Sequence, residues 1–183
     1  MTMSKKKSMN FHEARLDLIC YILNNGLEYL NVIKKRNGYG KIIRNYHQST
    51  PDGVDVYKKK RGMDYLVHSI EALEIIKKEK RFKDASKLLW YEHSVPIKII
   101  MEKLEFLAHN KAPNITTDDV RELMDCTSLV AISLKERDKI DNPDLGLKEK
   151  MPTSEWPPKD LFARFNHRDV KIELEDNYHQ KKL

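Results

Sequence analysis

Apolar residues recur at helical spacing along most of this chain, and one run alone has the character of a β-strand. From Phe11 to Lys35 the apolar positions fall three or four residues apart, as they do on the buried face of a helix. Residues 128–134 (Ser-Leu-Val-Ala-Ile-Ser-Leu) instead form a nearly continuous apolar run of strand length. The sequence therefore predicts a mostly α fold with a small β element, in the α+β class.

The other expected elements follow from periodicity and from residues that cap helices. Ser133 and Glu136 stand at the separation of a capping box, and Thr116 and Asp119 repeat that spacing. Pro96 suits the first turn of a helix. The pattern predicts helices over residues 41–46, 63–80, 82–89, 96–108, 117–125, 134–141 and 159–165, a stop at 37–40, and further strands ending before Pro96 and near 170–174.

The length of the chain favours a single compact domain. Its 183 residues fall within the ~100–200 residues that are usual for one domain. We divide it into a basic helical N-terminal region (1–61), a helical core with a ββα-like unit (62–175) and a flexible tail (176–183). We expect the helical N-terminal half to pack on the ββα-like unit.

The net charge of +6 is unevenly distributed. Residues 1–61 carry 13 lysines and arginines against 5 acidic residues, whereas residues 62–183 carry 21 against 23. Such a basic half attracts polyanions, because lysine and arginine displace counterions from phosphates. A solvated, solubilising face explains the same charge equally well. The predicted nucleic-acid-binding residues are Lys34, Lys35, Arg36, Lys58, Lys59, Lys60 and Arg61.

The composition excludes several classes of protein. No apolar run approaches the ~20 residues of a membrane span, and no apolar segment follows the first lysines as it does in a signal peptide. Cys20 and Cys126 are too few for a disulfide scaffold or a cysteine-based zinc site. Glycine-rich nucleotide-binding motifs are absent from the sequence. We therefore expect a cytoplasmic protein that has no contact with membranes.

The residues best suited to chemistry lie in the middle of the chain. Glu92 and His93 stand side by side near the end of the first expected strand, and the helix after residues 128–134 carries Asp138. If the two strands pair, they form a ββα unit with that helix. Imidazole can deprotonate water near neutral pH, and carboxylate oxygens suit Mg²⁺. Together these groups fit the hydrolysis of a phosphodiester.

Residues 90–142 resemble the HNH, or ββα-metal, endonucleases, whose first motif is typically an Asp-His pair followed by proline and whose last motif is a His or Asn on the helix. The resemblance makes Glu92 the metal-binding acid, His93 the general base, and Asp138 with Asn142 the distal ligands of Mg²⁺ or another divalent cation. It implies an endonuclease of a restriction, phage-defence or phage-encoded kind, with DNA favoured over RNA. The chain departs from the family in having Glu for Asp, Asp138 for His or Asn, and roughly 30 residues between the strands.

A second hypothesis is a non-catalytic helical module that binds nucleic acid or protein as a regulator or inhibitor, and a third is a purely structural helical protein. The nuclease requires oxygens of Glu92 and Asp138 within about 2–2.6 Å of one cation, with His93 open to solvent. The binding module leaves these residues scattered or held in salt bridges. Arg164, between two phenylalanines, suits either a phosphate or a packed short helix, and Trp90 suits a core or rim position better than a base-stacking platform.

Overall fold

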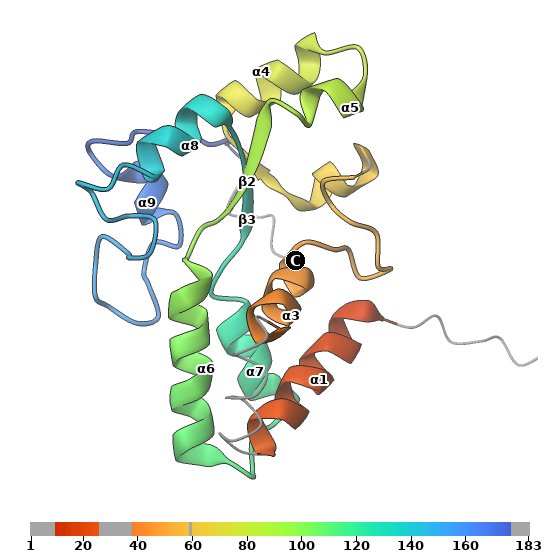
Figure 1. Cartoon of the computed structure of the whole chain (residues 1–183), viewed down its shortest axis with the longest axis vertical. Coiled ribbons are helices and arrows are strands. Elements are labelled where there is room, and N and C mark those ends of the chain that lie inside the picture. Colours follow the sequence, from red (N-terminus) through yellow and green to blue (C-terminus); the bar gives the residue numbers. More distant parts are fainter. Residues whose placement is uncertain (1–9, 26–37, 59, 177–183) are drawn as a thin grey trace, which may run out of the picture.

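The computed structural model describes residues 10–25, 38–58 and 60–176, whose arrangement is shown in Figure 1. This part of the chain consists of helices and a small three-stranded sheet, which confirms the predicted α+β class. The helices are α1 (Phe11–Asn24), α3 (Gly38–His47), α4 (Ile70–Lys78), α5 (Phe82–Ala85), α6 (Ile97–Lys111), α7 (Thr117–Met124), α8 (Leu134–Ile140) and α9 (Ala163–Asn166), with a 3-10 helix over Lys60–Tyr65. The strands are β1 (Val67–His68), β2 (Leu89–His93) and β3 (Leu129–Ser133).

Helices α1, α3, α6 and α7 pack together as a helical layer, in the lower part of Figure 1. Leu16 and Ile19 on α1 are fully buried in one apolar cluster with Ile43 of α3 and Leu104 of α6. These are the positions that the helical periodicity assigns to the buried face. The layer combines elements from both sides of residue 61, so the N-terminal region is built into the helical core.

The sheet has the strand order β1-β3-β2, and α8 follows β3 directly. Strands β2 and β3 are antiparallel, with Leu89 opposite Ser133 and His93 opposite Leu129. The predicted pairing of the two strands and the helix after them is thus confirmed. The predicted capping box is present as well, because Ser133 and Glu136 each bond the other's backbone N–H.

The chain leaves β2 into α6 and returns from α7 into β3, and polar contacts close the base of this excursion. The backbone N–H of Val95 donates to the hydroxyl of Thr127 (3.0 Å), which donates to the carbonyl of Val95 (3.0 Å). The hydroxyl of Ser94 accepts from the N–H of Ser128 (2.9 Å). The two strands therefore remain in register although two helices separate them in sequence.

Several of the predicted helix boundaries are wrong. The helix predicted over 82–89 ends at Ala85, and Leu89 begins strand β2 instead. Residues 63–80 do not form one helix, because Val67 and His68 pair with β3 as a short parallel strand and Ser69 then caps α4. Residues 37–40 do not all stop a helix, because α3 begins at Gly38 and buries Ile43 in the helical layer. Residues 26–37, which include the second half of the helix predicted from 11 to 35, lie outside the described residues.

The C-terminal part of the chain wraps over the sheet. Phe162 and Phe165 pack with Val67 of β1 and Val130 of β3 in a second apolar cluster. The strand predicted near residues 170–174 is reduced to an isolated bridge at Leu174, beside β1. The helix predicted over 159–165 is limited to the single turn α9. In the described part of the chain, no helix has the length and apolar character that crossing a membrane requires.

Candidate functional site

A cleft of about 360 Å³ lies along β2, where the sheet meets the helical layer. Its walls come from the ends of α3 and α8, the start of α6 and the turn after α8, so it joins both parts of the fold. The lining residues are Arg44, Gln48, Trp90, Tyr91, Glu92, His93, Pro96, Ile97, Lys98, Arg137, Asp141, Lys148 and Glu149.

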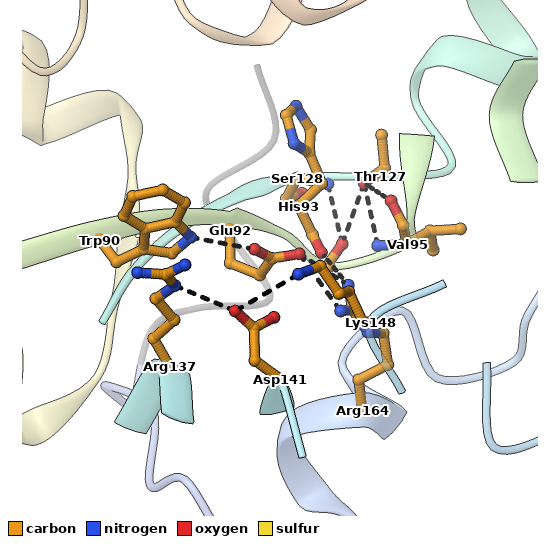
Figure 2. A network of polar contacts seen from close by, with 11 residues as sticks. Trp90, Glu92, His93, Val95, Thr127, Ser128, Arg137, Asp141, Lys148 and Arg164 are labelled. Carbon is orange, nitrogen blue, oxygen red and sulfur yellow. Dashed lines mark hydrogen bonds and ion pairs between the residues drawn. The ribbon is translucent and has the colours of Figure 1, made fainter. Parts of the chain in front are cut away.

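Glu92 lines the cleft, but neighbouring side chains engage both of its carboxylate oxygens (Figure 2). Oε1 accepts hydrogen bonds from both terminal nitrogens of Arg164, at 3.1 and 3.2 Å. Oε2 accepts one from the indole N–H of Trp90 at 3.2 Å. Glu92 is therefore held as the partner of a buried guanidinium.

Arg164 is fully buried, and it connects the C-terminal wrap to β2. Besides Glu92, it donates a 2.7 Å hydrogen bond to the backbone carbonyl of His93. Burial lowers the pKa of Arg164 and the charge of Glu92 opposes that shift, so the guanidinium stays charged. The Phe-Ala-Arg-Phe sequence therefore places its arginine inside the fold, between the phenylalanines that cover the sheet.

His93 lies on the opposite face of β2 from Glu92. The register with β3 runs unbroken through both residues, so no bulge brings the two side chains together. Figure 2 shows the imidazole pointing away from the carboxylates of Glu92 and Asp141. His93 is 7% exposed, and its ring packs edge-on against His47, with ring centroids 5.3 Å apart. Burial, with the nearby His47, Arg44 and Arg164, places the pKa of His93 well below its usual value.

Asp138 and Asn142 are exposed and lie outside the lining of the cleft. Asn142 instead accepts a hydrogen bond from the backbone N–H of Asp144 at 3.0 Å, which shapes the turn after α8. The acid that lines the cleft is Asp141, the residue that caps the C-terminal end of α8, bonded by Arg137 (3.1 Å) and close to Lys148 (3.8 Å). Among the described residues, no three His, Cys, Asp or Glu side chains are placed to share a metal ion.

The cleft is rich in cationic side chains. Arg44, Lys98, Arg137 and Lys148 line it against three carboxylates, and Arg164 lies behind Glu92. Lys98 is paired with Glu149 at 2.8 Å, but both side chains are more than half exposed. Arg44 is exposed on α3 and has no carboxylate partner in the described part of the chain.

Of the basic residues predicted from the sequence, only Lys58 has a side chain that the structure describes, and it does not line this cleft. Lys58 is exposed and pairs with Asp55. Lys60 and Arg61 begin the 3-10 helix, and their side chains lie outside what the structure describes. Lys34, Lys35, Arg36 and Lys59 are also outside the described residues. The cleft cations come from three helices and the turn after α8, far apart in sequence, so no basic run in the sequence indicates them.

Two aromatic contacts adjoin the cleft. The guanidinium carbon of Arg137 lies 3.9 Å from the centre of the Trp90 indole, and the rings of Tyr57 and Tyr91 lie 5.5 Å apart. Trp90 is 39% exposed, as expected for a residue at the rim.

The chain matches no family model, no curated protein and no solved structure.

Proposed function

We propose that the protein binds nucleic acid in the cleft along β2. The observation that carries this proposal is Arg44, whose guanidinium has no carboxylate partner among the described residues and lies at a cleft that also holds Lys98, Arg137 and Lys148. Guanidinium groups match the geometry of phosphate oxygens and remain charged at any physiological pH. The excess of lysine and arginine in residues 1–61 adds a long-range attraction for the same polyanion.

The carboxylates of the cleft do not oppose this function. Glu92 and Asp141 are each neutralised by an arginine, and Glu149 pairs with Lys98 at the surface. A phosphate that entered the cleft would therefore contact Arg44 directly. It could also replace Glu149 as the partner of Lys98. We also propose a cytoplasmic location, which fits a chain with only two cysteines.

The test measures binding at several salt concentrations. Fluorescence anisotropy with labelled DNA and RNA gives the slope of log affinity against log salt, which changes by roughly 0.7–0.9 for each phosphate contact. Arg44→Gln should weaken binding and flatten the slope by about one contact. Arg81→Gln removes an exposed arginine from the start of α5, away from the cleft, and is the control of equal charge. Equal effects of the two variants, or no binding by wild type, would refute the proposal.

Metal-dependent hydrolysis of nucleic acid is a second candidate, and the order of β2, β3 and α8 favours it. Glu92, His93 and Asp141 all line the one cleft beside this ββα unit. For a divalent cation to bind, Glu92 must release Arg164 or Asp141 must release Arg137. His93 must in addition turn from the interior towards the cleft before it could act as a base.

Cleavage assays separate the two candidates. Plasmid DNA and a structured RNA are incubated with Mg²⁺ or Mn²⁺ and wild-type protein, His93→Ala or Asp141→Asn, with circular dichroism to show that each variant is folded. Divalent-dependent nicking that both variants lose would support the nuclease, with Asp141 as a ligand in place of Asp138. Salt-sensitive binding without nicking would leave the protein as a binding module.

A further inference from the structure

A second hollow, of about 190 Å³, adjoins the cleft and has aromatic walls. Tyr57, Trp90 and Tyr91 line it together with Gln48. Three of these residues also line the cationic cleft, so the two hollows are adjacent. The aromatic hollow is smaller than the about 300–1,000 Å³ that is usual for a small-molecule site. Its size therefore suits a single ring system, with the rest of the ligand in the larger cleft.

Trp90 is held in a fixed orientation between the two hollows. Its indole N–H is bonded to Glu92 at 3.2 Å, and Arg137 covers the ring at 3.9 Å. Arg137 lines the cationic cleft but not the aromatic hollow, whereas Trp90 borders both. Trp90 and Tyr91 are neighbours on an unbroken strand and point to opposite faces, so the hollow lies across this edge of β2. A ring that is already immobilised loses little conformational freedom when a second ring stacks on it.

The remaining walls add polar groups that suit the edge of a base. The hydroxyl of Tyr91 is buried and has no hydrogen-bond partner among the described residues. Gln48 carries an amide, which can donate and accept at once, and in the described part of the chain it makes no side-chain hydrogen bond. Nucleobases present such donors and acceptors around a flat apolar ring.

We infer that this aromatic hollow stacks an unpaired base while the adjoining cations hold its phosphates, so that the ligand is single-stranded nucleic acid. The inference rests on the proposed nucleic-acid binding and adds the form of the strand. In a duplex the faces of the bases are covered by their neighbours, whereas every unpaired base offers a face to an aromatic side chain. A duplex could therefore contact Arg44 and Lys98 but could not fill the hollow beside Trp90.

The fluorescence of Trp90 tests the stacking directly. Trp156→Phe leaves Trp90 as the single tryptophan, because the chain contains two. Oligothymidylate added to this variant should quench the emission, and a hairpin duplex of the same length should not. In anisotropy titrations, Trp90→Leu should weaken single-strand binding roughly 5- to 150-fold, which is the range for loss of one stacked base, and this loss should exceed the loss of duplex binding.

A second variant protects the test from a folding defect at Trp90. Tyr57→Leu removes another wall of the hollow without touching the bond between Trp90 and Glu92, and it should also weaken single-strand binding selectively. Equal binding of single strand and duplex, with no quenching and no effect of either variant, would overturn the inference and leave nucleic-acid binding intact. Absence of any binding would overturn both. Displacement of the oligonucleotide by free thymidine monophosphate would assign the hollow to a nucleotide and overturn the single-strand inference.

Discussion

The helical layer and the sheet with its C-terminal wrap are stabilised in different ways. The helical layer is held by interdigitating apolar side chains from long helices, such as Leu16, Ile100 and Leu104. The sheet part also has an apolar cluster, but its irregular segments are positioned by buried polar groups, chiefly Arg164 and Glu136. The difference shows that short and irregular elements, which supply few backbone hydrogen bonds of their own, depend on individual side chains for their position.

The largest expected effect is the loss of the buried arginine. Arg164→Ala should reduce the free energy of unfolding by about 3–5 kcal/mol, because Glu92 would keep its charge without a partner. Arg121→Ala in the helical layer removes an arginine that also bonds a glutamate twice, Glu13 at 2.9 Å, but at a partly exposed site. Its cost should stay below about 1 kcal/mol. Urea denaturation of the two variants gives both values, and similar losses would show that the two arginine–glutamate pairs are equally solvated.

The second-largest effect is expected from acidification, which should destabilise the contact between the helical layer and the sheet. Burial lowers the pKa of His47 to about 4, and an unfolded histidine titrates near 6.5. The unfolded chain therefore binds more protons over this interval, so stability falls as the pH drops from about 6.5 towards 4. The loss from His47 should be about 2 kcal/mol at pH 5 and about 3 kcal/mol near pH 4, with a further loss from the buried His93.

Urea denaturation at pH 7.5 and pH 5 measures this dependence. His47→Gln should flatten the profile, because glutamine has no proton to bind. His109→Gln, on the exposed side of α6, is the matched control and should leave the profile unchanged. A profile that stays as steep in His47→Gln as in wild type would place the titrating group elsewhere.

A smaller difference is expected between the two capping boxes. Thr116 and Asp119 form an exposed box at the start of α7, whereas Ser133 and Glu136 form a buried one at the start of α8. Glu136 also accepts a 2.5 Å hydrogen bond from Ser69, the cap of α4. Thr116→Ala should cost about 0.5–1 kcal/mol and Ser133→Ala about 2 kcal/mol. Thermal unfolding ranks them, and the reverse order would show that burial adds nothing to the cap of α8.

The smallest effect on stability is expected from a substitution in the cleft. The pair of Lys98 and Glu149 is exposed on both sides, so Lys98→Ala should change the free energy of unfolding by less than about 1 kcal/mol. Nucleic-acid binding should weaken in the same variant, because one phosphate contact is lost. Thermal unfolding and anisotropy on one preparation compare the two effects. A large loss of stability with unchanged binding would make Lys98 a structural residue.

Elements with a repeating pattern could be predicted from the sequence, and elements fixed by distant contacts could not. Helices α6 and α7 show helical spacing or capping residues, and β3 is a continuous apolar run. The local sequence is therefore enough to predict these elements. Strand β1 has two residues, too few for any period, and exists because β3 offers it hydrogen bonds. The predicted helix over 63–80 therefore ran through it.

The sequence indicated where along the chain the candidate site lies, but not which side chains it brings together. Glu92 and His93 do line the cleft, yet alternation along an unbroken strand separates their side chains, and the partner of Glu92 lies 72 residues further along the chain. Sequence spacing has no means of pairing such residues. The cationic residues of the cleft come from α3, α6, α8 and the following turn, and only the packing of these elements brings them together.

The late position of Arg164 in the chain has a consequence for the order of folding. All four helices of the helical layer are complete by residue 124, and their contacts can form as synthesis proceeds from the N-terminus. Strand β2 is synthesised before β3, its pairing partner, and Glu92 is synthesised well before Arg164. Closing the sheet therefore requires contacts of high sequence separation. During that interval a nascent chain would present an edge strand with an unpaired carboxylate, a surface of the kind that chaperones shield.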